Sequence, residues 1–177
     1  DDEFEEFFRL AKAAVNAHAD AFIVQDIGAA FFLKQNFPNI VLHASTQMGI
    51  HNLRGAEIAE ELGFERVILA RETKKSDMKE IHERTHLETE CFVQGALCVS
   101  FSGNCYFSSS QFNKSGNRGE CLQLCRLKYW AKNKRGNICE GYLLSPADLC
   151  LIEKLNELKD CGISSFKVEG RLRRKGY

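Results

Sequence analysis

The sequence contains no long apolar run, and its N-terminal residues do not show the pattern of a secretion signal. A membrane-spanning helix needs about 20 consecutive apolar residues, and a secretion signal places a shorter apolar stretch behind basic residues. Nothing in the sequence therefore indicates membrane insertion or secretion, and we expect a cytoplasmic protein. Cysteine, in contrast, is plentiful, with 8 among 177 residues. Because a chain of this length builds a core without disulfides, we expect the cysteines to have a different role.

The chain carries no net charge, because 24 Lys and Arg balance 24 Asp and Glu, but the charges are unevenly distributed. Residues 1–90 carry 17 acidic and 10 basic side chains, whereas residues 91–177 carry 7 acidic and 14 basic ones. Seven basic residues and one Glu lie between Gln111 and Arg135, interleaved with aromatic residues. Such a segment is either a solvated basic loop or a site for a polyanion, which could be RNA or a small carboxylate or phosphate.

Four cysteines lie within one segment rich in Gly, Ser and Asn, with the spacing Cys98-x6-Cys105-x15-Cys121-x3-Cys125. Four thiolates that a loop brings together are the ligand set of an iron–sulfur cluster or a structural zinc. Structural zinc usually uses close pairs such as C-x2-C, and only the last two cysteines are close, so zinc is the less favoured metal. We expect a [4Fe–4S] cluster on these four residues, with Cys139 and Cys150 as reserve ligands.

Plain thiols and disulfides stay open as alternatives for this set of cysteines. Cys91 and Cys161 lie in or beside apolar segments, where a free cysteine behaves as a small buried hydrophobe. The neighbours of the four-cysteine set are Gly, Ser and Asn, which suit a buried thiol poorly. A metal or cluster site is therefore the favoured interpretation.

The rest of the chain alternates between segments with strand and helix patterns. Apolar periodicity predicts helices over residues 4–18, 28–35, 53–62, 77–85 and 145–160. The last of these opens on Ser145-Pro146-Ala147-Asp148, with Ser as N-cap and Pro at the first helical position. Short apolar runs predict strands over 21–24, 40–44, 66–70, 90–93 and 165–168. This alternation is typical of a parallel sheet.

Polar side chains follow the predicted strands. They are Gln25, Asp26, His43, Ser45, Gln47, Arg71, Glu72, Gln94, Glu169 and Arg171. In a parallel α/β sheet the carboxyl ends of all strands lie on one face, where active sites form. The cysteine-rich segment leaves the same face after Val93. We therefore expect these segments to converge on one site.

A complete barrel of this kind has eight strands in roughly 200 residues or more, and this sequence predicts five. The sequence also begins inside a predicted helix and without an initiator Met. We expect an α/β fold, namely the incomplete C-terminal part of a parallel TIM-barrel-like (β/α) barrel that lacks its first strands. Residues 1–177 would form one domain, with a cysteine-rich cluster-binding segment, 94–141, inserted after one strand.

Seven motifs occur in order along the chain: VQDIG (24–28), LHASTQM (42–48), RVILARE (66–72), FVQGALCVSFSGNCYFSS (92–109), GNRGECLQLCR (116–126), YLLSPADLC (142–150) and FKVEGR (166–171). Together they resemble the peptidase U32 family, also called collagenase-like proteases, over essentially the whole chain. The resemblance implies further N-terminal strands in full-length members. It also implies an iron–sulfur cluster on cysteines that match the four-cysteine set, with a fourth ligand nearer Cys139 in one branch.

The resemblance implies three functions. Members hydroxylate bases in transfer or ribosomal RNA, help to hydroxylate ubiquinone precursors without oxygen, or are named for proteolysis that could be metal-dependent. The RNA-modifying members draw on prephenate, a small dicarboxylate. A peptidase would need a nucleophile with a positioned base, and the sequence has no G-x-S-x-G elbow. The letters H-E-x-x-H do occur at His82-Glu83-Arg84-Thr85-His86, but at a helix end on the wrong side of the sheet, so we expect surface histidines there.

We therefore expect an iron–sulfur-dependent RNA base hydroxylation protein, with a collagenase-like peptidase and an oxygen-independent quinone-precursor hydroxylation factor as the alternatives. His43 would move protons, and Glu72 and Glu169 would orient the reacting groups. The side chains expected to bind an anionic substrate are Arg71, Arg171 and Gln47, of which the arginines suit a small carboxylate by bidentate pairing. The side chains expected to hold RNA phosphates are Lys114, Arg118, Arg126 and Lys128.

Overall fold

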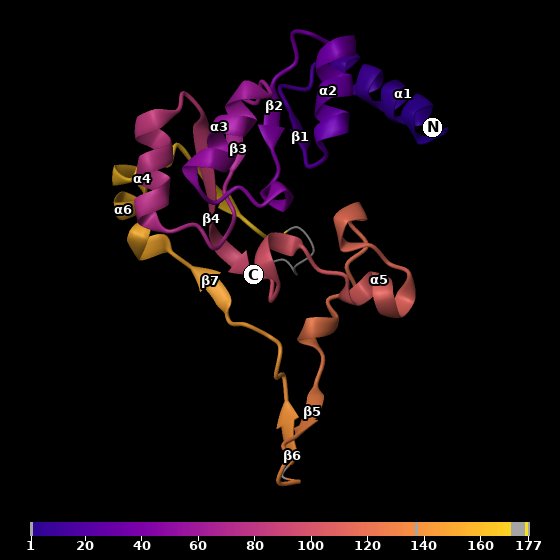
Figure 1. Cartoon of the computed structure of the whole chain (residues 1–177), viewed down its shortest axis with the longest axis vertical. Helices are drawn as coiled ribbons and strands as arrows, with labels where there is room; N and C mark the ends of the chain where they lie inside the picture. Colours follow the sequence, from indigo (N-terminus) through magenta and orange to yellow (C-terminus); the bar gives the residue numbers. More distant parts are fainter. Residues whose placement is uncertain (1, 137, 171–175, 177) are drawn as a thin grey trace.

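The structure is a computed structural model that describes residues 2–136, 138–170 and 176. Figure 1 shows an α/β layer from which a narrow two-stranded hairpin projects. The layer is built on parallel strands, which are β1 (Phe22–Val24), β2 (Leu42–Ala44), β3 (Arg66–Ile68), β4 (Glu88–Ala96) and β8 (Ser165–Val168). They stand in the order β1-β2-β3-β4, with β8 paired to β4. The predicted α/β class with a mostly parallel sheet is confirmed.

Helices pack against one face of this sheet. They are α2 (Ile27–Asn36), α3 (Leu53–Glu61), α4 (Lys75–Arg84) and α6 (Leu155–Asp160), while α1 (Asp2–Asn16) packs on α2 through contacts to Phe32. Two of them begin at polar caps, because Asp26 Oδ1 accepts from the Ala29 amide at 2.7 Å and Asn52 Oδ1 accepts from the Gly55 amide at 2.9 Å. These caps satisfy amides that would otherwise lack partners in the first turn.

The core lies between the helices and alternate residues of the strands. Leu42, Ala44, Val67, Leu69, Cys91 and Val93 contribute from the sheet, and Leu33, Ala56 and Ile81 from the helices. The residues between them in each strand face the opposite way, as the period of two requires. In register across the sheet these are Ile23, His43 and Arg66, followed by Ile68 and Glu90. The second face therefore carries charged as well as apolar side chains.

The predicted helix over 145–160 is wrong in its first half. Residues 148–150 form a strand, β7 (Asp148–Cys150), and only α6 (Leu155–Asp160), preceded by one tight 3-10 turn, is helical. The reason is tertiary, because β4 extends to Ala96 and its last residues pair antiparallel with β7. The Leu151 amide also donates to the Val93 carbonyl at 2.8 Å. These sheet hydrogen bonds outweigh a local helix-start pattern worth about 1 kcal/mol.

Residues 97–147 connect β4 to β7 in short pieces. They contain the helix α5 (Phe107–Phe112), 3-10 turns at Phe101–Gly103, Gly116–Arg118 and Leu124–Arg126, and the hairpin of β5 (Tyr129–Lys132) and β6 (Ile138–Gly141). Apart from Ser102 and Ser108, the described residues of this connection are not buried. Within the described ranges no helix combines the length and apolar character that crossing a bilayer demands.

Candidate functional site

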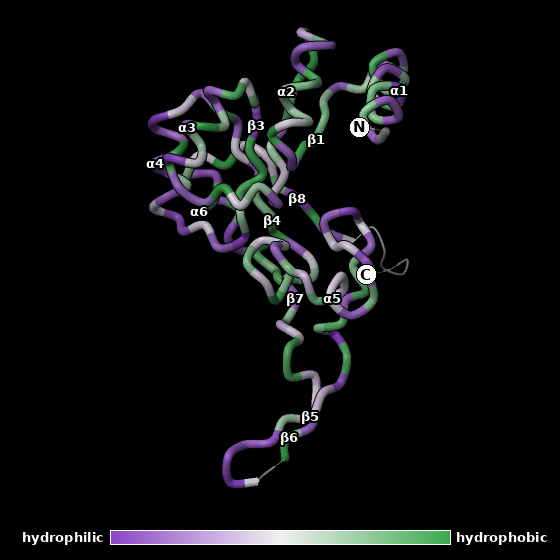
Figure 2. The backbone as a smooth tube through the Cα atoms, turned by 45° about the vertical axis from the view of Figure 1, so that its right-hand side comes forward, coloured by the Kyte–Doolittle hydropathy of each residue, from purple (hydrophilic) through white to green (hydrophobic). Residues whose placement is uncertain are grey.

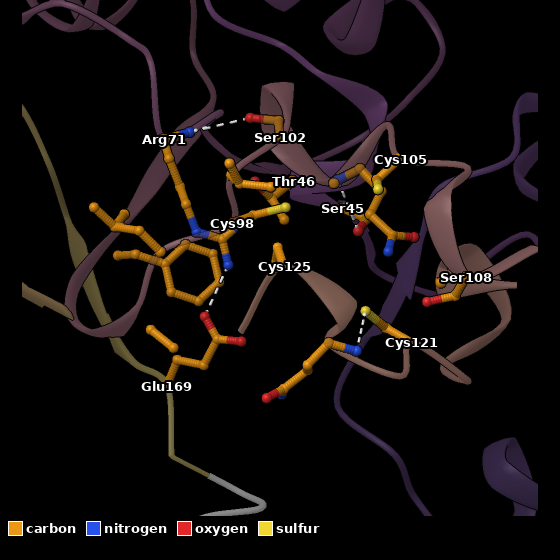
Figure 3. A pocket seen from close by; sticks show the side chains of 18 of the residues that line it. Ser45, Thr46, Arg71, Cys98, Ser102, Cys105, Ser108, Cys121, Cys125 and Glu169 are labelled. Atoms are coloured by element: carbon orange, nitrogen blue, oxygen red, sulfur yellow. Dashed lines mark hydrogen bonds and ion pairs between the residues drawn. The ribbon is translucent and has the colours of Figure 1, made fainter. Parts of the chain in front are cut away.

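A pocket of about 400 Å³ lies at the carboxyl ends of the parallel strands. One wall comes from residues that follow β2, β3 and β8, namely Ser45, Thr46, Gln47, Arg71 and Glu169. The other wall comes from the connection after β4, including its cysteines (Figure 3). Gln25, Asp26 and Gln94, which also follow strands in the sequence, do not line it. The pocket therefore joins chain segments that lie more than a hundred positions apart.

The four-cysteine set lines this pocket: Cys98, Cys105, Cys121 and Cys125. Burial raises the pKa of the Cys125 thiol, the neighbouring Arg126 lowers it, and the other three cysteines raise it further. That mutual influence means that the four sulfurs are electrostatic neighbours. Two of the thiols accept backbone hydrogen bonds, from the Phe107 amide to Cys105 Sγ and from the Gln123 amide to Cys121 Sγ, both at 3.4 Å.

Side chains in the described ranges place no three His, Cys, Asp or Glu groups closely enough to hold a single metal ion. The same four thiols nevertheless surround one space (Figure 3). In a [4Fe–4S] cluster each thiolate binds its own iron, so the ligands encircle the cluster and need not approach one atom as zinc ligands do. An all-sulfur donor set with backbone amides donating to two of the sulfurs fits such a group better than a zinc ion.

Ser102 fixes the shape of the chain between the first two cysteines. It is fully buried, and both its amide and its hydroxyl donate to the Glu72 carboxylate, the amide at 2.7 Å. The Arg71 amide donates to the same hydroxyl at 3.2 Å. Ser102 has a left-handed backbone with φ 42°, which is uncommon for a residue with a side chain. Glu72, expected to orient reacting groups, therefore holds the loop and does not line the pocket.

Arg126 performs a similar task on the far side of the pocket. Its guanidinium donates to the Ser145 hydroxyl at 2.8 Å, the Pro146 carbonyl at 2.5 Å and the Leu97 carbonyl at 2.6 Å. This side chain was expected to hold RNA phosphate, but the structure uses it to join the start and the end of the connection. It also places a positive charge next to Cys125.

Arg71 and Glu169 form the charged corner of the pocket. The Arg71 Nη2 to Glu169 Oε2 distance is 2.8 Å, and the guanidinium lies 4.2 Å from the centroid of the Phe92 ring. Arg71 is 13% exposed and Glu169 is 45% exposed, so the acid is the partner that solvent or a ligand reaches first. Glycine at position 95 permits this geometry, because a β-carbon there would lie 2.5 Å from the Glu169 carbonyl oxygen.

His43 does not lie in this pocket, contrary to its expected place on the functional face. It is the middle residue of β2, so its side chain follows Ile23 and Arg66 onto the second face, in a hollow near the amino ends of the strands. Burial, followed by the charge of Arg66, lowers its pKa despite nearby carboxylates. A neutral imidazole that is remote from the thiols cannot exchange protons directly with a group in the pocket.

The remaining predicted residues that the structure describes lie outside the pocket. Lys114 pairs with Glu120 at 2.9 Å, and Arg118 pairs with Glu3 at 3.0 Å. Lys128 Nζ lies 5.7 Å from the centroid of the Tyr142 ring. Two reserve ligands, Cys139 on β6 and Cys150 on β7, are exposed and do not line the pocket. Arg171 lies outside the described residues.

The H-E-x-x-H letters do not form a zinc-binding helix turn. Helix α4 ends at Arg84, and Thr85 already has an extended backbone. His82 and His86 are both exposed, as expected, and His86 follows the end of the helix. The two imidazoles therefore do not sit one turn apart on a single helical face.

A family profile described as peptidase family U32 matches residues 1–177. The chain belongs to peptidase family U32. Among solved structures, a U32 peptidase has the same fold with a TM-score of 0.59, at 15% identity over 98% of this chain and 64% of that one. The partial barrel expected from the number of predicted strands is consistent with this shared fold.

Curated relatives of this U32 chain bear different names. A 23S rRNA 5-hydroxycytidine synthase of Escherichia coli is 41% identical over 179 residues, which cover 100% of this chain and 27% of that protein. The tRNA hydroxylation protein P1 of Bacillus subtilis is 33% identical, with 94% and 41% covered. A collagenase of Porphyromonas gingivalis is 34% identical, with 93% and 43% covered. This chain therefore spans well under half the length of each of these relatives.

Sequence reasoning missed several pocket residues of the U32 chain. Lys167 lines the pocket, with its Nζ 3.0 Å from Glu90 Oε1 and 5.6 Å from the centroid of the Phe92 ring. Alternation along β8 was a usable signal, because residues 167 and 169 share one face of the strand. Ser102 gave no signal, since nothing local marks one serine among many as the partner of Glu72.

Proposed function

We propose that this chain forms the cluster-binding part of an RNA base hydroxylation protein that acts on transfer or ribosomal RNA. Cys98, Cys105, Cys121 and Cys125 would hold a [4Fe–4S] cluster. The observation that carries the proposal is the pocket itself, where four cysteines from a single loop face Arg71 and Glu169 at the carboxyl ends of the strands. Two relatives named for rRNA and tRNA hydroxylation support RNA as the substrate.

The chain's own residues would prepare the pocket for its cofactor. The bound cluster would supply electron transfer, with a potential set by hydrogen bonds and exposure around its sulfurs. The amides of Phe107 and Gln123 would stabilise the thiolate forms of the two cysteines to which they donate. Arg126, next to Cys125, would offset part of the burial that raises the pKa of that thiol.

The charged corner would bind and orient the substrate. Arg71 is held over the Phe92 ring and paired with Glu169, so its planar fork is preorganised for a carboxylate or phosphate. An anionic group that replaced Glu169 as its partner would release that carboxylate toward the open side of the pocket. Among the described residues that line the pocket, Glu169 carries the only carboxylate. We therefore assign proton transfer to Glu169 rather than to His43.

The described part of the pocket contains no serine–histidine pair of the kind that a serine peptidase uses. Ser102 is buried against Glu72, and the Ser108 hydroxyl is buried and accepts from the Leu122 amide at 3.1 Å. No histidine within the described ranges lines the pocket. A serine nucleophile needs an accessible hydroxyl with a positioned base. The Ser102 hydroxyl is fully buried and bonded to Glu72, which holds the loop, and no histidine among the described pocket residues serves Ser108. Because one relative is named a collagenase, proteolysis still belongs in the test.

The test is nucleoside mass spectrometry of RNA from a strain in which the gene for this chain is deleted. We expect the loss of one hydroxylated pyrimidine, restored by the wild-type gene and by Cys161→Ala but not by Cys105→Ala. In parallel, anaerobically purified wild-type protein should contain iron and sulfide. An unchanged RNA profile together with gelatin cleavage by cluster-free protein would support a peptidase instead. An unchanged RNA profile with loss of ubiquinone would point to a quinone precursor.

A further inference from the structure

The hairpin of β5 and β6 is a prominent feature that the pocket does not use. It projects away from the α/β layer in two different views (Figures 1 and 2). Its strands pair from Tyr129↔Gly141 to Lys132↔Ile138. All described residues from 130 to 140 are exposed. A two-stranded ribbon without a core beneath it is marginally stable in water, so contact with a partner would stabilise it.

One face of the hairpin presents a large aromatic side chain. Directly paired residues point to the same face of a ribbon, so the pairs Trp130–Glu140 and Lys132–Ile138 share one side. Trp130 is 70% exposed and Ile138 is 67% exposed. Exposed tryptophan with no contact to a core is unusual for its size and marks a surface that another molecule covers.

The tip of the hairpin is basic and hydrophilic (Figure 2). Lys132, Lys134 and Arg135 lie in or next to the turn, and Glu140 is the only acidic residue of the two strands. Among the described residues, no carboxylate lies within ion-pair distance of these three cations, unlike Lys114 and Arg118 nearer the pocket. Unpaired cations can neutralise external phosphates without first breaking an internal ion pair.

The hairpin follows directly on a segment that lines the cysteine pocket. It starts three residues after Arg126, and Lys128 at its base packs over Tyr142. Strand β5, four residues long, spans about 13 Å at about 3.3 Å per residue. An RNA strand held along the ribbon would therefore lie a few nucleotides from the pocket opening, with unstacked bases available for aromatic contact.

We propose that the β5–β6 hairpin is an RNA-binding finger. Trp130 stacks on an unpaired base, and Lys132, Lys134 and Arg135 bind the flanking phosphates. A flat indole next to several cations matches single-stranded RNA, in which each nucleotide supplies one base to stack and one phosphate to neutralise. An acidic protein surface would pair with the cations but would offer the indole nothing to stack on. The finger rests on the proposed RNA function and adds a recognition surface outside the pocket.

The experiment measures binding of the purified chain to a short fluorescein-labelled single-stranded RNA of mixed sequence, by fluorescence anisotropy over a range of salt concentrations. Trp130→Ala should weaken binding at least about fivefold with little change in salt dependence, because it removes a stacking contact. The triple variant Lys132→Gln, Lys134→Gln, Arg135→Gln should reduce the slope of log K against log salt by about 2, since each phosphate contact contributes about 0.7.

A matched control removes three exposed cations elsewhere, with Lys12→Gln, Lys79→Gln and Lys159→Gln on the helices. This variant has the same net charge as the hairpin triple variant and should bind RNA like the wild type. Equal weakening by both triple variants, or no weakening by the hairpin variants, would overturn the finger. Unfolding midpoints of all variants should match the wild type, and Trp130→Phe should keep most of the binding because it keeps a ring.

Binding and modification separate the two proposals. If the hairpin variants bind and modify RNA like the wild type, the proposed role of the hairpin is refuted and the proposed function is unaffected. If RNA binding depends on the hairpin but deletion of the gene leaves the RNA nucleosides unchanged, the RNA-binding role of the hairpin is supported and the hydroxylation function is refuted. Capture of anionic vesicles or of a protein, with unchanged RNA binding in the variants, would assign the hairpin to that partner instead.

Discussion

Replacing Ser102 with alanine should destabilise the protein by about 2–3 kcal/mol. The hydroxyl of this buried residue donates to the Glu72 carboxylate and accepts from the Arg71 amide. A hydrogen bond to a charged group contributes about 1.5–3 kcal/mol, and the exposure of Glu72 favours the lower end of that range. The Arg71 amide, left without a partner, adds about 1 kcal/mol. This cost is at the low end of its range because the amide faces a pocket that water can enter.

Ser102→Gly separates the hydrogen bonds from the backbone strain. With φ 42° and ψ 41°, Ser102 has a left-handed conformation that costs a residue with a β-carbon about 1–2 kcal/mol and costs glycine little. The glycine variant loses the same hydroxyl as the alanine variant but relieves this strain. We therefore expect Ser102→Gly to be about 1 kcal/mol more stable than Ser102→Ala.

Urea unfolding of the single and double variants of Ser102 and Glu72 measures the interaction directly. A double-mutant cycle with Ser102→Ala and Glu72→Ala should give a coupling free energy of at least about 1 kcal/mol. Additive effects, within about 0.5 kcal/mol, would refute the claim that this pair fixes the loop between the first two cysteines. Ser110→Ala, at an exposed position of α5, is the matched control and should change stability by less than about 0.5 kcal/mol.

Three further predictions concern titration and reactivity. Burial lowers the pKa of His43 below 6.5, so the unfolded chain binds a proton at this site more tightly than the folded protein does. The free energy of unfolding should therefore fall as the pH drops below 6.5. Urea unfolding of His43→Gln should show a weaker dependence of stability on pH. Glu90→Gln removes the partner of Lys167 and should cost about 2 kcal/mol at pH 7, whereas an unchanged urea midpoint would contradict a stabilising pair. Burial raises the pKa of Cys91 to about 11, so in the folded protein Cys91 should react with a thiol reagent more slowly than the exposed Cys139 does. Peptide mass spectrometry would measure the two labelling rates, and equal rates would contradict the prediction.

The order of strands and helices could be read from the sequence because it depends on local patterns. Apolar periodicity and polar caps placed β1, β2, β3 and β8 within two residues of their observed bounds. Local patterns failed at Ser145, where the helix-start signal was sound but the free edge of β4 recruited the following residues into β7. A sheet edge is created by residues about fifty positions away, so no local pattern contains it.

In the candidate site too, local patterns identified some residues, whereas the contacts of others depended on the tertiary structure. The type and spacing of the cysteines were sufficient to single out Cys98, Cys105, Cys121 and Cys125, because thiols in a flexible polar loop have few chemical uses. The partners of charged side chains were not predictable in this way. Arg126 ties two loop ends together, and Arg118 pairs with an acid 115 positions earlier. Only the tertiary structure decides such pairs, since a salt bridge or hydrogen bond depends on distance in space.

The sequence by itself determined the alternation of strands and helices and the chemical character of the four-cysteine loop. Both follow from side-chain chemistry and from periods of 2 and 3.6 residues, which any local segment carries. The tertiary structure decided that His43 lies away from the pocket, that Glu72 supports a loop, and that the cations of the hairpin tip stay unpaired among the described residues. Those outcomes depend on which distant segments the folded backbone brings within a few ångströms of each other.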